Sequence, residues 1–240
     1  MIWLTYSFLT KNINRYGQKK QSRDKKYNPF DYLCVLNKLK GNLPMTRTWS
    51  IIASATPVFV VLAFLFWKTS GINPWSLTVA SAISYAILYL LTAFSKKYIP
   101  GLMTLAIAAS AVGMTYAATG ASDWSVLLPA LPVGIISEGI LKARAAFASG
   151  MNTKKDAVSY SIMMILPYVG VGVISMAGFL PVYTVFVFLT IAIAIACSTT
   201  MFKNLGQGDL LLADLEARTS NLQIMFSTIL AISLIIARLF

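Results

Sequence analysis

Long stretches almost without charge are the feature of this sequence that most limits its fold. Between residues 49 and 239, apolar runs of about twenty residues recur, which is the length that an α-helix needs to cross a lipid bilayer. A helix also satisfies its own backbone hydrogen bonds, which lipid cannot do. The runs predict spanning helices at 49–67, 75–94, 100–118, 124–141, 157–178, 181–202 and 221–239. The expected fold class is all-α, a polytopic transmembrane helical bundle of about seven transmembrane helices.

The composition supports lipid as the solvent of these runs. Hydrophobic residues make up 57% of the chain and charged residues 12%, whereas soluble domains average roughly 45–50% and 25%. We therefore treat residues 49–240 as a seven-helix transmembrane domain. Residues 1–48 precede it as a basic cytoplasmic or interfacial segment, with a short amphipathic helix expected near 29–40.

The positions of Lys and Arg predict the orientation, because cytoplasmic loops of membrane proteins are enriched in these residues. With the N-terminus inside, the inner segments are 1–48, 95–99, 142–156 and 203–220, and they hold eighteen of the twenty Lys and Arg residues. Only Lys68 and Arg238 fall outside. The sequence therefore predicts a cytoplasmic N-terminus, a C-terminus outside, and a multi-pass protein of the bacterial inner (cytoplasmic) membrane.

The net charge of +12 could suggest a nucleic-acid partner. However, half of the Lys and Arg residues precede the first expected span, and such juxtamembrane clusters set topology and contact anionic lipid head groups. We therefore expect membrane lipids as partners and no nucleic acid.

Residue types that are missing exclude several kinds of site. The chain has no histidine, which excludes histidine-ligated haem and zinc and the Ser-His-Asp triad. Its two cysteines, Cys34 and Cys197, are isolated and make neither a metal site nor a disulfide framework. No metal site and no cofactor are expected.

The expected helix at 100–118 carries small residues at four-residue spacing, among them Ala109, Gly113 and Ala117. Small-residue faces let transmembrane backbones approach closely. We therefore expect this face to be buried in the bundle.

Glu138 is the one acidic residue placed well inside an expected span, about one turn from its inner end. Because an intramembrane carboxylate is costly, it should have a partner. Lys142 lies four residues on, on the same helix face, and is the expected partner. In the loop that follows, Arg144, Lys154 and Lys155 could bind a phosphate or lipid head group, or could simply be positive-inside residues.

Three stretches are similar to segments of the UbiA-type intramembrane prenyltransferases, especially the branch that prenylates dihydroxynaphthoate in menaquinone synthesis. Residues 46–58 (TRTWSIIASATPV) resemble that family's opening Arg-Pro-x-Thr segment and the Ser-x-x-Pro-Val of its first helix. Residues 131–136 (LPVGII) resemble the start of the helix before its second acidic motif. Residues 212–220 (LADLEARTS) resemble the beginning of its last helix.

The resemblance implies a shortened relative that lacks the family's chemistry. Family members have about nine helices and two Asp-rich motifs, which hold Mg²⁺ against an allylic diphosphate; carboxylates are the ligands that Mg²⁺ prefers. At the first motif this chain has Ser95, Lys96 and Lys97. At the second, the aspartates would fall near Ala148 and Asn152. One helical hairpin between the two motifs is missing.

The resemblance therefore favours a non-catalytic UbiA-like protein that binds an isoprenoid lipid, a quinone or a pigment tail, or that serves as a subunit of a larger membrane complex. The alternatives are an active Mg-dependent prenyltransferase of divergent type, with carboxylates from another chain or with diphosphate held by lysines, and a small transporter. We predict no catalytic residue. The candidate lipid- or anion-binding residues are Glu138, Lys142, Arg144, Asn152, Lys154 and Lys155.

Overall fold

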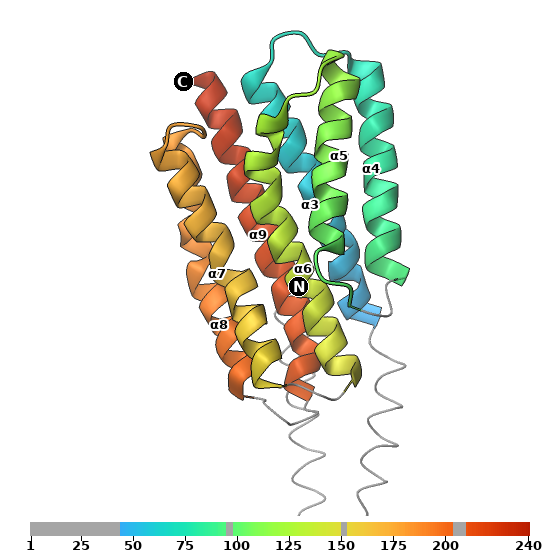
Figure 1. Ribbon diagram of the computed structural model, residues 1–240, viewed down its shortest axis with the longest axis vertical. Helices are drawn as coiled ribbons and strands as arrows, with labels where there is room; N and C mark the ends of the chain where they lie inside the picture. The colour runs from blue at the N-terminus through green and yellow to red at the C-terminus, as the bar shows by residue number, and fades with distance from the viewer. Residues whose placement is uncertain (1–43, 95–97, 150–152, 204–209) are drawn as a thin grey trace, which may run out of the picture. The chain divides into compact units, whose positions relative to one another are not determined.

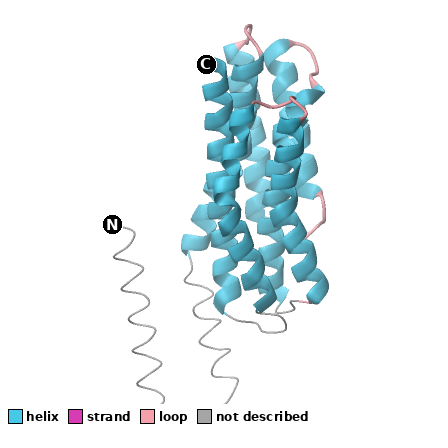
Figure 2. Ribbon diagram, turned by 90° about the vertical axis from the view of Figure 1, so that its left-hand side faces the viewer, coloured by secondary structure: helices cyan, strands magenta, loops and turns pink. Residues whose placement is uncertain are grey.

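A computed structural model of the chain describes residues 44–94, 98–149, 153–203 and 210–240 (Figure 1). In these ranges the chain is helical, without strands (Figure 2). The elements are α3 (Pro44–Lys68), α4 (Pro74–Phe94), α5 (Leu102–Thr119), the 3₁₀-helix η1 (Trp124–Val126), α6 (Leu127–Ser149), α7 (Lys154–Met176), the 3₁₀-helix η2 (Val182–Thr190), α8 (Ile191–Lys203) and α9 (Leu210–Leu239).

Seven helical segments in the described part are long and apolar enough to cross a membrane, if η1 is joined to α6 and η2 to α8. The predicted fold class is confirmed at this level: the part of the chain that the structure describes is all-helical, as expected for a multi-pass integral membrane protein. Among the helix starts, the largest differences are at α3, which starts at Pro44 where 49 was expected, and at α9, which starts at Leu210 where 221 was expected. The amphipathic helix expected near 29–40 and Asn152 lie outside the described residues. The orientation in the membrane stays a prediction from the charges.

Helices α3, α6 and α9 form the centre of the bundle, where each packs on the other two. Helices α4 and α5 lie on one side of this centre, and α7 and α8 lie on the other (Figure 1). The contacts between α3 and α9 are the most extensive. Gln223 of α9 bonds near the middle of α3 and Arg238 bonds to Trp67 near its end, so the two helices run in the same direction. Because α3 is the first crossing and α9 the last, a shared direction means that the number of crossings from α3 to α9 is odd, as it is for seven.

A proline in α3 explains why the side-chain amide of Gln223 is buried between α3 and α9. Pro57 lies inside α3 and has no N–H, so the carbonyl of Ala53 lacks its usual partner four residues on. The Gln223 amide donates to this carbonyl at 3.1 Å, and the Thr56 hydroxyl donates to it at 2.9 Å. Gln223 and Thr56 therefore together satisfy a carbonyl that has lost its backbone partner, as buried backbone in lipid requires.

The small-residue face of α5 is not buried as expected. Ala109 and Gly113 are exposed, and a Cβ on Gly113 would meet no other atom within 4 Å. The face that α5 turns towards the bundle mixes large and small side chains, among them Ile107, Ala111 and Ala118. The close approach of backbones comes from α6, where a Cβ on Gly134 would lie 3.1 Å from the Thr104 Cα. The small residues at packed faces are therefore not Ala109 and Gly113, which the four-residue spacing indicated.

The sixth crossing begins with an unusually long 3₁₀ stretch, since such helices seldom exceed four residues. Two hydroxyl pairs fasten η2 to α7: Ser175 bonds Thr184 at 2.5 Å, and Tyr168 bonds Thr190 at 2.7 Å. Thr184 and Thr190 also donate to carbonyls three residues earlier, which is the hydrogen-bond spacing of a 3₁₀-helix. Side-chain hydroxyls from a neighbouring helix thus support this conformation.

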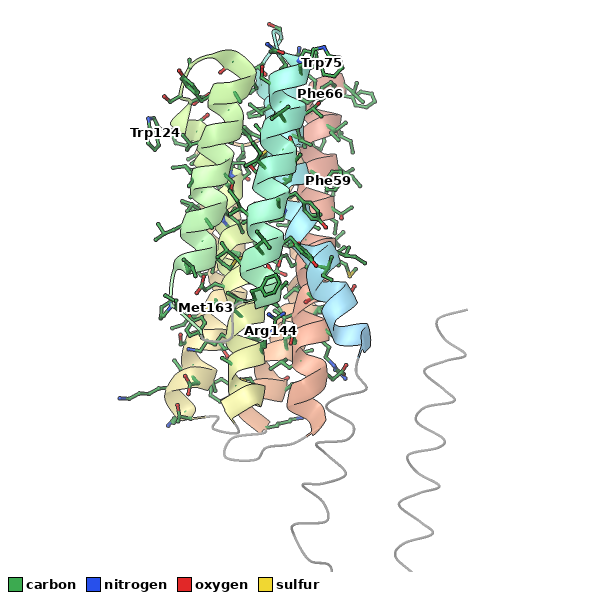
Figure 3. The ribbon with its side chains drawn as sticks, turned by 90° about the vertical axis from the view of Figure 1, so that its right-hand side faces the viewer. Phe59, Phe66, Trp75, Trp124, Arg144 and Met163 are labelled. Atoms are coloured by element: carbon green, nitrogen blue, oxygen red, sulfur yellow. The ribbon has the colours of Figure 1, made fainter. Side chains whose placement is uncertain are left out.

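Two exposed tryptophans lie near one end of the bundle, Trp75 at the start of α4 and Trp124 at the start of η1 (Figure 3). Tryptophan favours the membrane–water interface. At the same end, the Lys68 ammonium lies 2.8 Å from the Asp123 carboxylate, which also caps η1 by accepting from the Ser125 N–H. Hydrogen bonds from Lys68 and Ser125 lower the pKa of Asp123 to about 2.

Candidate functional site: a groove between α5, α6 and α7

The Glu138 carboxylate caps a neighbouring helix. It accepts hydrogen bonds from the backbone N–H groups of Gly101 at 2.9 Å, Met103 at 3.1 Å and Thr104 at 3.4 Å. These donors belong to the first turn of α5, where N–H groups have no partner within the helix and where the helix dipole favours a negative charge. Glu138 therefore fastens the start of α5 to α6, and the expected ion pair with Lys142 is wrong.

Lys142 instead faces the start of α7 and the segment before α5. Its ammonium lies 3.5 Å from the Asp156 carboxylate and 5.2 Å from the centre of the Tyr98 ring, where a cation is attracted to the aromatic face. Burial, together with the charge of the neighbouring Glu138 carboxylate and a hydrogen bond to it, raises the pKa of Tyr98 to about 12. Tyr98 thus contacts both residues: its ring faces the Lys142 ammonium and its hydroxyl bonds the Glu138 carboxylate.

Arg144 ties three helices together. Its guanidinium donates two hydrogen bonds to Glu216 of α9, at 2.6 and 3.0 Å, and a third to the carbonyl of Thr92 in α4. It is half-buried, so these contacts hold the ends of α4, α6 and α9 in register. Its predicted contact with a lipid head group has no counterpart in this geometry and stays a prediction.

A groove with a volume of about 810 Å³ opens beside these contacts. Its walls are the start of α5, with Gly101 and Thr104, and one face of α7; α6 lies between them with Ile135 and Glu138 (Figure 1). The volume lies in the range of small-molecule sites, roughly 300–1,000 Å³. The groove is open to the outside of the bundle, because Val158, Ile162 and Leu166 in its lining are about half exposed.

The α7 wall changes from charged to apolar along its length. It begins with Lys154 and Lys155 at the end of the bundle, followed one turn later by Ser159. Beyond Ser159 the lining side chains are apolar, and Ile162 and Leu166 are about half exposed. This is the pattern of an amphiphile's binding surface: cations at the membrane surface and apolar side chains deeper.

The start of α7 is fixed by its own cap. The Thr153 hydroxyl accepts from the Asp156 N–H at 3.2 Å, and the Asp156 carboxylate accepts from the Thr153 N–H at 3.3 Å. Such a reciprocal box defines where a helix begins. It places Lys154 and Lys155 in the first turn of α7, at the mouth of the groove.

Three of the predicted site residues therefore meet in one place, because Glu138, Lys154 and Lys155 all line the groove. Lys142 lies next to them through Asp156 and Tyr98, whereas Arg144 binds elsewhere in the bundle. Met163, also from α7, lines the groove and lies in the same half of the bundle as Arg144 (Figure 3).

Sequence reasoning missed the apolar and hydroxyl lining, which comes from three helices. A signal existed on α7, where Lys155, Ser159, Ile162 and Leu166 follow helical spacing along one face. No comparable pattern marks Gly101 and Thr104, because their position depends on how α5 packs.

Comparison of the chain with known protein families, with curated proteins and with solved structures finds no match in any of the three. In the ranges that the structure describes, no three Cys, Asp or Glu side chains gather as they would around a metal ion. The resemblance to the prenyltransferases accordingly stays a prediction from the three sequence stretches.

Proposed function

We propose that this chain is a non-catalytic membrane protein that binds one lipid molecule in the groove between α5, α6 and α7. The observation that carries the proposal is the groove itself: a volume of about 810 Å³, lysines at its mouth and apolar side chains towards the bilayer interior. Lipids are the molecules that such a surface meets first, since it opens sideways into the membrane.

The state of the carboxylates supports a non-catalytic role. Each acidic side chain in the described ranges already has a protein partner: Asp123 with Lys68, Glu138 with the start of α5, Asp156 with Lys142, Asp214 with Arg218 and Glu216 with Arg144. A Mg²⁺–diphosphate centre needs several oxygen ligands in one place. These residues are instead used to hold helices together.

The similarity of residues 46–58, 131–136 and 212–220 to prenyltransferase segments makes isoprenoid lipids, quinones and pigment tails candidates for the apolar part of the ligand. A role as a subunit of a larger membrane complex is compatible with such binding. The basic segment 1–48 is then the part of the chain available for a partner in the cytoplasm.

A pair of matched variants tests the groove. Ile162 and Val169 are both on α7 and are 55% and 54% exposed, but only Ile162 lines the groove. Ile162→Trp should fill part of the volume and remove the lipid that co-purifies with the protein, as measured by native mass spectrometry and lipid extraction. Val169→Trp should retain it. Equal lipid content in both variants would refute binding in this groove.

A turnover assay tests the non-catalytic part separately. Purified protein is incubated with Mg²⁺, a polyprenyl diphosphate and dihydroxynaphthoate, and we expect no prenylated product. Product formation above a protein-free control would establish the enzymatic alternative, whatever lipid the groove holds.

A further inference from the structure

The two lysines of the groove lack partners that most other cations of the bundle have. Lys68, Lys142, Arg144 and Arg218 each pair with a carboxylate. Lys154 and Lys155, by contrast, form no ion pair within the described part of the chain and are exposed at the mouth of the groove. Two unpaired ammonium groups at one opening favour an anionic ligand group there.

Two hydroxyls of the groove are also unused. Several Ser and Thr hydroxyls of α5, α6 and α7 donate to a carbonyl four residues earlier; Ser161 of α7 does so at 2.9 Å. The hydroxyls of Thr104 and Ser159 have no such bond to any described residue, and they line the groove from opposite walls. The polar groups offered to a ligand are therefore two ammonium groups and two hydroxyls, all of which can donate, because the Glu138 carboxylate is occupied by α5.

These donors lie in a fixed order of depth along α7. Ser159 is four residues beyond Lys155, or about 6 Å along the helix axis, and Leu166 is about 16 Å beyond Lys155. Thr104 lies in the first turn of α5, at the same end of the bundle. A ligand along this wall thus meets cations first, hydroxyl donors one turn deeper, and apolar side chains beyond.

We propose, on the basis of the lipid-binding function above, that the occupant is an acidic glycerophospholipid. Its phosphate lies between Lys154 and Lys155, its ester carbonyls accept from Thr104 and Ser159, and one acyl chain follows Ile162 and Leu166. The order of the donors carries this choice. An isoprenyl phosphate has no ester carbonyl at the depth of the hydroxyls, a quinone has no anionic group for the lysines, and a choline head group would place a cation beside them.

The test uses the full-length chain in detergent with EDTA present, and native mass spectrometry to compare three probes: dioleoylphosphatidylglycerol, dioleoylphosphatidylcholine and geranylgeranyl phosphate. Phosphatidylglycerol should bind most tightly. Lys154→Gln with Lys155→Gln should weaken it about 25-fold, or about fivefold for each cation near the membrane surface. Lys203→Gln should leave it unchanged, since Lys203 is exposed at the end of α8 and does not line the groove.

Thr104→Val with Ser159→Ala should weaken the binding of phosphatidylglycerol by about twofold to tenfold for each lost hydrogen bond and leave the binding of geranylgeranyl phosphate unaffected. Lys154→Arg with Lys155→Arg should retain tight binding, which guards against a folding defect in the Gln variant. Equal binding of phosphatidylglycerol and phosphatidylcholine, tighter binding of geranylgeranyl phosphate, or a requirement for Mg²⁺ would each overturn this inference. The lipid-binding function would survive those results as long as Ile162→Trp and Val169→Trp still differ.

Discussion

Replacing Glu138 by Gln tests whether this carboxylate is a cap for α5. The carboxylate accepts two good hydrogen bonds, from Gly101 at 2.9 Å and Met103 at 3.1 Å, and a longer one from Thr104. The amide has one oxygen left, so at least one buried N–H loses its acceptor, and the negative charge beside the helix N-terminus disappears. A lost charged hydrogen bond costs about 1.5–3 kcal/mol and the charge–dipole interaction about 1 kcal/mol.

We therefore expect Glu138→Gln to lower the free energy of unfolding by about 3 kcal/mol, which is more than a hundredfold in the unfolding equilibrium. The assay is reversible unfolding by SDS in mixed micelles, followed by tryptophan fluorescence. Ser137→Ala is the matched control on α6, because the Ser137 hydroxyl is equally buried but donates only to the Val133 carbonyl of its own helix. That control should cost less than about 1 kcal/mol.

A Glu138→Gln protein as stable as the wild type would refute the capping role. If such a protein also lost its bound lipid, the carboxylate would be a ligand contact, and the donor-only description of the groove would be wrong. If instead the variant is destabilised but keeps its lipid at saturating concentrations, the cap and the ligand site are separate.

Three further predictions concern other parts of the bundle. Gln223→Leu should destabilise the protein by about 1 kcal/mol in SDS unfolding. Adding Pro57→Ala should reduce that cost, because the N–H gained at position 57 can donate to the Ala53 carbonyl in place of Gln223. Additive costs of the two substitutions would contradict this pairing. The pKa of Asp123, about 2 when folded and about 3.9 when unfolded, gives a stabilisation that is complete above about pH 4 and lost as pH falls towards 2. Because this carboxylate is 38% exposed, this stabilisation should stay below about 1 kcal/mol and should be absent in Asp123→Asn. Unfolding measured as a function of pH checks both expectations. Gly134→Leu should cost about 1–3 kcal/mol in thermal unfolding, since the side chain must push the Thr104 backbone away, whereas Gly113→Leu should cost less because that site is open.

The number of crossings could be predicted from the sequence because lipid imposes one rule on every spanning segment. The length of an apolar run and the satisfaction of its backbone depend on the run alone. The beginnings of α3 and α9 could not be predicted in this way. The first turn of α3 contains Arg47 and lies before its apolar run. The first turn of α9, at 210–213, is apolar, but Asp214, Glu216 and Arg218 separate it from the last apolar run.

The partner of Glu138 shows why the site was harder to predict. Helical spacing predicts Lys142 as the partner because it lies four residues away on the same helix, yet the actual partners are backbone groups 34–37 residues earlier. No side-chain type marks a backbone N–H as a partner. Such a contact depends on where α5 begins relative to α6, which is a property of packing that local spacing does not contain.

The groove was only partly foreseen for a similar reason. Lys154 and Lys155 stood out because charge is rare in this chain, whereas Ile162 and Leu166 are ordinary residues of an apolar span. These two side chains line the groove because α5 and α7 both pack on α6 and leave the groove between them.

The 3₁₀ stretch at the start of the sixth crossing changes how far that segment reaches. Nine residues with a rise of about 2.0 Å cover about 18 Å, whereas an α-helix of the same length would cover about 13.5 Å. The crossing thereby gains roughly 4.5 Å without an added residue, close to one helical turn. If η2 relaxed into an α-helix, either Lys203 would be drawn towards the hydrocarbon or the loop at Pro181 would sink into it. The thickness of the surrounding bilayer therefore acts directly on the hydroxyl pairs between η2 and α7.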